Sequence, residues 1–246
     1  DRVPFIELFA DPDIVTSVAG GPPIPASART GDRERYEAYL QQRIRFCRTV
    51  GFDFVYAATH LEVPISILQA DDTAELTREK RGWVSESEGV IASLADFEAF
   101  PWPLPEQISY FELEYVAANL PEGMKVIATT TGVLENVMWL MGYAPFAVAL
   151  YDNPELVEAM FQRVGDLLAS VYTNICAHPA VGAVFIGDDM GHRSGTMVHP
   201  DHLRHYVFPR QKRLAQIAHA HGLPFLLHAC GDLHAVMDDL SDGVGI

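Results

Sequence analysis

The chain has 246 residues, of which 49% are hydrophobic and 20% are charged. These values are typical of a globular protein with a sizeable core, and they exclude disordered and fibrous proteins. With 33 acidic and 17 basic side chains the formal net charge is −16, which disfavours contact with nucleic-acid phosphates and with anionic membrane surfaces. We therefore expect neither nucleic acid nor a membrane among its partners.

The apolar stretches and the cysteines predict the setting of the protein. The most apolar stretch, residues 137–151, is interrupted by a glycine and a proline and is shorter than the roughly 20 residues that a membrane-spanning helix needs. Three cysteines lie far apart, at Cys47, Cys176 and Cys230, and no secretory signal is recognisable, so we expect a reduced, cytoplasmic setting. Because the chain begins at Asp1 and ends inside an apolar run, we expect it to be part of a longer polypeptide.

Short apolar runs with strand character alternate with longer helical patterns. Strands are expected at residues 3–9, 52–58, 124–130, 183–187 and 224–228. Helices are expected at residues 34–50, ending at Gly51, from Pro154 after the N-cap Asn153, and at residues 201–221 after Pro200, because these residues are typical of helix starts and ends. The last residues, 242–246, predict a turn that enters a sixth strand.

Apolar strands separated by helices favour a parallel sheet covered on both faces, either an open doubly wound sheet or a (β/α)8 TIM barrel. The glycine fingerprint of dinucleotide-binding sheets does not follow the first strand, which counts against the doubly wound alternative. Barrels of this type carry their active sites where the strands end. Polar residues gather at these positions: Glu7, Thr59, His60, Thr130, Asp188, Asp189, His228 and Cys230. The sequence therefore predicts an α/β fold of the (β/α)8 barrel class.

One predicted strand ends in the run Leu-Leu-His-Ala-Cys-Gly at residues 226–231. Side chains alternate along a strand, so His228 and Cys230 point to the same face. An imidazole and a thiolate aimed at one point form half of a tetrahedral zinc site. The alternative is a core histidine bonded to the backbone beside a packed cysteine. Asp188 and Asp189 also have two interpretations, as reactive carboxylates or as partners of a helix start.

Three segments carry a family resemblance. They are residues 186–191 (Ile-Gly-Asp-Asp-Met-Gly), 199–203 (His-Pro-Asp-His-Leu) before a helix with Pro209, and 227–232 (Leu-His-Ala-Cys-Gly-Asp). Together they resemble the uroporphyrinogen decarboxylase (URO-D) superfamily. The His-x-Cys-Gly run is similar to its branch of cobalamin-dependent methyltransferases, which includes methylcobalamin:coenzyme M methyltransferase. The resemblance implies one (β/α)8 barrel domain over residues 1–246 that lacks its last strands, with a hairpin and loop inserted near residues 78–105.

The resemblance also implies the chemistry. His228 and Cys230 would hold zinc together with a further ligand, which this branch takes from a cysteine on a later strand. Zinc would bind a substrate thiol as thiolate, and the thiolate would take a methyl group from the cobalamin of a separate corrinoid protein. Tetrahydrofolate as the small acceptor would instead need an acid, for which Asp188, Asp189 and Glu7 are candidates. The residues then expected to contact substrate are Thr59, His60, Thr130 and Met190.

Two alternatives stay open at this point. Uroporphyrinogen decarboxylases resemble one another in an arginine-rich N-terminal loop and in an aspartate after the second strand. At the position of that aspartate this chain has Thr59. That departure disfavours decarboxylation of a tetrapyrrole. The other alternative is a non-catalytic tetrapyrrole- or corrinoid-binding protein that has kept the cleft and lost the chemistry.

Overall fold

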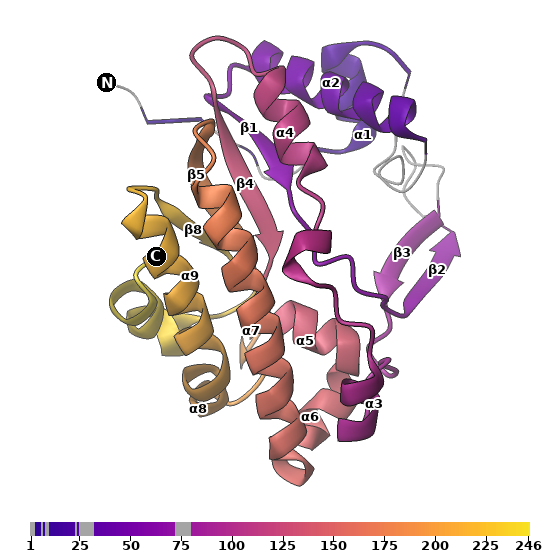
Figure 1. Cartoon of the computed structure of the whole chain (residues 1–246), viewed down its shortest axis with the longest axis vertical. Coiled ribbons are helices and arrows are strands. Elements are labelled where there is room, and N and C mark those ends of the chain that lie inside the picture. Colours follow the sequence, from indigo (N-terminus) through magenta and orange to yellow (C-terminus); the bar gives the residue numbers. More distant parts are fainter. Residues whose placement is uncertain (1–2, 6, 8–9, 23, 25–31, 72–79) are drawn as a thin grey trace.

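The centre of the fold is a parallel four-stranded sheet in the order β1-β4-β5-β8 (Figure 1). The computed structural model describes all residues except 1–2, 6, 8–9, 23, 25–31 and 72–79. The sheet strands are β1 (Phe54–Ala58), β4 (Lys125–Thr131), β5 (Val181–Gly187) and β8 (Phe225–His228), and the short antiparallel pairs are β2 (Ile67–Asp71) with β3 (Lys80–Val84) and β6 (Gly191–His192) with β7 (Gly195–Thr196).

Helices connect the strands of this sheet. The α-helices are α1 (Pro12–Ala19), α2 (Arg33–Val50), α3 (Leu94–Ala99), α4 (Phe111–Ala118), α5 (Val133–Met141), α6 (Tyr143–Asp152), α7 (Pro154–Cys176), α8 (Pro200–His202) and α9 (Phe208–Ala220). Short 3-10 or π-type turns are η2 (Pro105–Gln107), η3 (Leu203–Val207), η4 (His234–Val236) and η5 (Asp239–Val244). The predicted α/β class is confirmed. Within the described residues four parallel strands form a sheet that does not close, as expected for a (β/α)8 barrel that lacks its last strands.

The four sheet strands are apolar runs that the sequence predicts. Val126, Ala128, Val184 and Ile186 are at most 1% exposed, because helices cover the face of the sheet to which they point. On the other face several strand residues are only partly buried, as the alternation along β1 shows. The register pairs Ala57 with Ala128, and Gly187 with His228. This pairing brings the ends of β1, β4, β5 and β8 to the same edge of the sheet.

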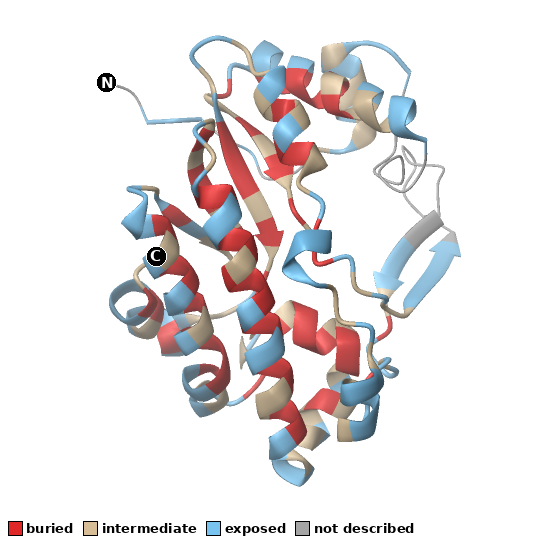
Figure 2. Cartoon of the chain, viewed as in Figure 1, coloured by how far each residue is buried: buried red, intermediate tan, exposed pale blue. Residues whose placement is uncertain are grey.

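The longest helix, α7, covers the sheet and packs against α5, α6 and α9 (Figure 1). Its start follows the predicted signal, since the Asn153 side chain accepts a hydrogen bond from the Leu156 N–H and Pro154 occupies the first turn. One stripe of the helix is buried, as the red bands in Figure 2 show. Tyr172 and Phe161 in this stripe have no exposed surface. The stripe therefore anchors α7 on the core.

The predicted helix at residues 201–221 is continuous in direction but contains the π-type turn η3. Pro209 explains this turn, because a proline has no N–H and its ring displaces the carbonyl four residues earlier. That carbonyl belongs to His205, and it accepts a hydrogen bond of 3.0 Å from Arg210 Nη1 instead.

The strand predicted at residues 3–9 is absent from the described part of that segment. Val3 and Phe5 are 87% and 54% exposed, and Pro4 has no N–H to offer a neighbouring strand. A hydrogen bond of 2.9 Å, from the Phe5 N–H to Asp53 Oδ2, ties the segment to the start of β1. The edge of β1 is open to a further strand, but the described residues of this segment form none, so the apolar pattern alone did not decide the pairing.

The sixth strand predicted near residues 242–246 is also wrong. These residues lie mainly in η5, which packs against α9. Leu240 and Val244 are buried and four residues apart, a spacing that places both on one side of a helical turn. The Gly245 N–H closes the turn on the Leu240 carbonyl at 3.0 Å.

The hairpin expected near residues 78–105 begins earlier, because its first strand, β2, spans Ile67–Asp71. Within the range 78–105 the described residues form β3, then loop, α3 and the first residue of η2. No described helix is by itself both long and apolar enough to cross a membrane; α5 and α6 meet that test only as a pair, and they bend by 97° at their junction.

Candidate functional site

Three possible metal ligands meet where β5 and β8 end. Asp189, His228 and Cys230 each offer a donor atom, and these atoms lie within 4.8 Å of one another. Cys230 Sγ lies 3.4 Å from His228 Nε2, and that nitrogen lies 3.7 Å from Asp189 Oδ1. The sequence predicted that His228 and Cys230 share a face. The parallel register adds Asp189, because Gly187 pairs with His228 and the residues two positions further on face each other.

Two glycines let the loops after β5 and β8 touch. A Cβ at Gly231 would lie 2.2 Å from the carbonyl carbon of Gly191, and Gly231 has φ of +84°, a conformation that side chains disfavour. The Asp232 N–H donates to the His192 carbonyl at 2.8 Å. The Cys230 N–H donates to Asp189 Oδ1 at 2.7 Å. These contacts hold the two loops together and orient the Asp189 carboxylate beside Cys230.

The donor set suits zinc, which binds sulfur, imidazole nitrogen and carboxylate oxygen. With bond lengths of about 2.0–2.3 Å, neighbouring ligands in a tetrahedral site lie about 3.3–3.8 Å apart, which matches the distances of 3.4 and 3.7 Å. The hydrogen bond to Asp189, burial, and the negative charges of Asp189 and Glu135 raise the pKa of the Cys230 thiol. A divalent cation would reverse this effect, because it stabilises the thiolate.

Asp188 has a different environment from its neighbour. Its side chain is fully buried and accepts hydrogen bonds from the N–H groups of Val133 (2.9 Å) and Glu135 (3.0 Å) and from Gln211 Nε2 (2.8 Å). It therefore binds the N-terminus of α5, where the helix dipole favours an anion. Burial raises its pKa to about 6, against the opposing effect of these hydrogen bonds. A Cβ at Gly132 would lie 2.0 Å from the Asp188 Cγ, so this position requires glycine.

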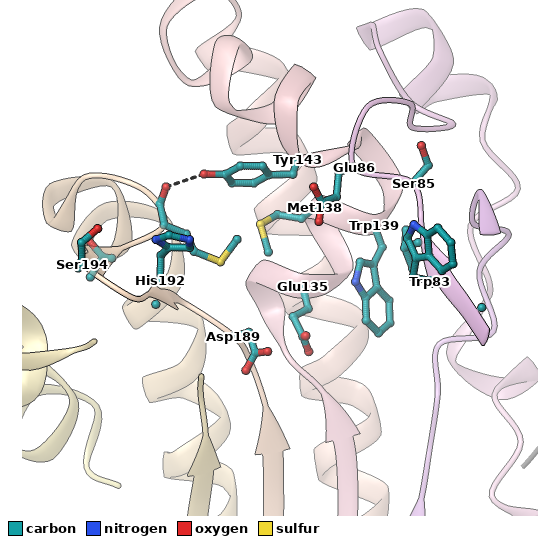
Figure 3. Close-up of a pocket in the computed structure, with 16 residues that line it drawn as sticks. Trp83, Ser85, Glu86, Glu135, Met138, Trp139, Tyr143, Asp189, His192 and Ser194 are labelled. Carbon is teal, nitrogen blue, oxygen red and sulfur yellow. Dashed lines mark hydrogen bonds between the residues drawn. The ribbon is translucent and has the colours of Figure 1, made fainter. Parts of the chain in front are cut away.

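Two cavities meet beside the cluster of Asp189, His228 and Cys230. We call the first, of about 910 Å³, the hairpin cavity, because it lies between β3 and the β6–β7 hairpin. The second, of about 630 Å³, is the sheet cavity, which extends over the ends of β1, β4 and β5. Glu135, Trp139 and Asp189 line both cavities. Figure 3 shows the carboxylates of Glu135 and Asp189 turned toward each other in the hairpin cavity.

Glu135 is a residue that the sequence reasoning missed. It lies in the first turn of α5, and burial together with the charges of Asp188 and Asp189 raises its pKa to about 8. At neutral pH its carboxyl group therefore holds a proton in the metal-free protein. The available signal was its position, three residues after the glycine that ends a strand and starts a helix.

The other predicted residues divide into two groups. His60 and Thr130 line the sheet cavity with His228 and Cys230, and Thr130 Oγ1 is 3.2 Å from the Tyr172 hydroxyl. The residues that line neither cavity are Thr59, Asp188 and Met190, which are at most 3% exposed, and Glu7, which is exposed in the N-terminal segment. Glu7 lies outside any strand in the described part of that segment, and residues 6, 8 and 9 of the predicted strand lie outside the described residues.

A buried ion pair lies at the far side of the sheet cavity. Arg43 of α2, which lines this cavity, is paired with Glu112 of α4, and their side chains are 4% and 3% exposed. Glu112 also accepts hydrogen bonds from the Ala58 N–H at 2.7 Å and from the Tyr36 hydroxyl. Burial lowers the pKa of Arg43, but the charge of Glu112 and two neighbouring tyrosines raise it above its ordinary value. The pair ties two helices to the end of β1.

Fold and site together define an α/β protein with ionisable groups at the carboxyl ends of parallel strands. A family model for uroporphyrinogen decarboxylase (URO-D) matches residues 76–246. The chain therefore belongs to the URO-D family, as its motifs predicted.

A methyltransferase from Methanosarcina mazei has a similar solved structure, with a TM-score of 0.63 and 14% sequence identity. The similarity covers 95% of this chain and 66% of that one. It shows a common fold, and the chain spans less than two thirds of the length of that protein. A search of curated proteins gave no match.

Proposed function

We propose that this chain carries the zinc-assisted site of a methyltransferase, which moves a methyl group between the cobalamin of a separate corrinoid protein and a small acceptor. The observation that carries this proposal is the cluster of Asp189, His228 and Cys230 at the meeting point of two cavities. Membership of the URO-D family and the fold shared with a methyltransferase support it.

In this proposal Asp189 takes the place of the third ligand that the sequence alone left unassigned. Zinc held by Asp189, His228 and Cys230 would lower the pKa of an acceptor thiol at a remaining coordination position. The two cavities provide separate approaches to that point for the acceptor and for the corrinoid. Glu135 faces both cavities and holds a proton near neutral pH, so it would serve acceptors such as tetrahydrofolate that need an acid. We place this chemistry in the cytoplasm, because Cys230 is exposed and must stay reduced.

A decarboxylase of tetrapyrroles is less well supported. Its substrate carries several carboxylates and needs basic partners. Among the described residues that line the two cavities the only arginine or lysine is Arg43, and its guanidinium is already paired with Glu112. A non-catalytic corrinoid-binding protein is distinguished from the proposed enzyme by the absence of turnover.

The first test is metal content, measured by elemental analysis after loading with zinc and removal of the excess. We expect about one zinc per chain, retained in Cys176→Ala and lost in Cys230→Ser and Asp189→Asn. Cys176 is a matched control because its thiol is buried in α7, outside the cluster.

The second test is turnover, followed by the absorbance change of methylcobalamin with a thiol acceptor. We expect transfer in the zinc-loaded wild type and in Cys176→Ala, and its loss in Cys230→Ser. Failure of the wild type to retain zinc would refute the zinc site. Retention of zinc without any transfer to a thiol or to tetrahydrofolate would favour the binding protein.

A further inference from the structure

The hairpin cavity has aromatic walls. Trp83 comes from β3, Trp139 from α5 and Tyr143 from the start of α6. Trp83 is 47% exposed, which is unusual because tryptophan is highly buried on average. In the view of Figure 3 the Trp139 side chain lies between those of Glu135 and Trp83. The Tyr143 hydroxyl donates to the Met197 carbonyl at 2.9 Å, which fixes its ring.

The charged groups of this cavity are acidic. Glu86, Glu135 and Asp189 line it, and no lysine or arginine is found among its described lining residues. Arg193, at the tip of the β6–β7 hairpin, is exposed and lies outside the lining. Asp189 and Cys230 would balance the charge of a zinc ion, which leaves the exposed carboxylate of Glu86 to act on a ligand. Carboxylates repel an anionic ligand and attract a cationic one.

We propose that the hairpin cavity binds a small organic cation of the ammonium class, so that the methyl acceptor carries a positive charge beside its reacting group. Aromatic faces attract ammonium groups through their negative quadrupole, and indole is the strongest of the aromatic side chains in this respect. The combination of indoles, a phenol and carboxylates is the chemistry that recognises such ions. The link to the acceptor rests on the proposed function, whereas cation binding by the cavity does not.

The binding test uses choline and its neutral isostere 3,3-dimethyl-1-butanol, which has the same shape without the charge. The quenching of tryptophan fluorescence reports binding, because two of the three tryptophans of the chain line the cavity. We expect choline to bind at least about tenfold more tightly than the isostere. Equal affinities, or no binding of choline at millimolar concentrations, would overturn the proposal.

Matched variants test whether choline binds in the hairpin cavity. Glu86→Gln and Trp83→Leu change exposed side chains, so we expect both to fold and to weaken choline binding by about fivefold to tenfold. The controls are Glu98→Gln, an exposed carboxylate on α3, and Trp102→Phe, outside the cavity. Choline binding that is unchanged in Glu86→Gln and Trp83→Leu would overturn the assignment to this cavity.

The acceptor test uses three two-carbon thiols whose second group is cationic, neutral or anionic: 2-mercaptoethylamine, 2-mercaptoethanol and 2-mercaptoethanesulfonate. We expect methyl transfer from methylcobalamin to be most efficient, in kcat/KM, with the amine and least efficient with the sulfonate. Choline binding without any methyl transfer would refute the proposed function and leave the cation site standing. Methyl transfer that prefers the sulfonate would refute the cationic acceptor and leave the methyltransferase standing.

Discussion

Loss of the negative charge of Glu112 should strongly destabilise the fold. In Glu112→Gln the side chain keeps its shape, and the amide oxygen can still accept from the Ala58 N–H, which lies 2.7 Å from the carboxylate in the wild type. The guanidinium of Arg43, however, loses its counter-charge in a site where its side chain is only 4% exposed. Leaving a buried charge unpaired costs about 3–5 kcal/mol, which is a large part of an ordinary stability of about 5–15 kcal/mol.

Urea unfolding followed by circular dichroism measures this cost. For a urea dependence of about 3 kcal/mol per molar, the midpoint of Glu112→Gln should fall by at least about 1 M. In the double variant Arg43→Met with Glu112→Gln the buried charge is gone, so we expect part of the loss to be recovered relative to the sum of the single variants. A Glu112→Gln protein within about 1 kcal/mol of the wild type would refute the reasoning that the pair is buried and mutually dependent.

Three further predictions concern the site. Gly132→Ala places a methyl group against Asp188 and should lower the free energy of unfolding by about 2–4 kcal/mol. The control is Gly243→Ala, whose methyl group meets no atom within 4 Å, and its stability should change by less than about 0.5 kcal/mol. Thermal unfolding of both variants and the wild type measures the difference. Gly231→Ala should weaken zinc binding by about tenfold or more, measured by competition with a chelator, and unchanged affinity would contradict the role given to the loop contact. The pKa of Glu135, raised to about 8, exceeds the unfolded value of about 4.3, so the metal-free folded protein binds a proton that the unfolded chain has released. The free energy of unfolding of the wild type should therefore fall, relative to that of Glu135→Gln, as the pH rises from about 5 to 8. Urea unfolding of both proteins over this pH range measures the difference, and an equal pH dependence of the two would contradict the prediction.

The sheet strands could be predicted because their apolar runs are continuous and because glycine or proline marks the ends of the helices between them. The strand predicted at residues 242–246 is wrong, and the strand predicted at residues 3–9 is absent from the described part of that segment. A local pattern shows that a segment is apolar, but pairing with a neighbouring strand decides whether it joins a sheet. Pro4 and the helical spacing of Leu240 and Val244 were the signals against these strands.

The candidate site was accessible from the sequence only in part. Strand alternation is a local property, so the shared face of His228 and Cys230 could be predicted. The position of Asp189 depends on the register between β5 and β8, and that of Glu135 depends on how α5 starts against Asp188. Both are tertiary relations between segments far apart in the chain, which a single sequence does not contain.

The binding of the Asp188 carboxylate to the N-terminus of α5 affects which ligands can bind where the sheet strands end. A helix start carries about half a positive charge and commonly serves as a phosphate-binding site. Here the protein supplies the anion itself, with the N–H groups of Val133 and Glu135 already occupied. A phosphorylated molecule therefore finds no backbone cradle at this point and meets the carboxylate of Asp189 instead. The two consecutive aspartates thus select against phosphorylated ligands. Asp188 occupies the N–H groups at the start of α5, and Asp189 repels a phosphate.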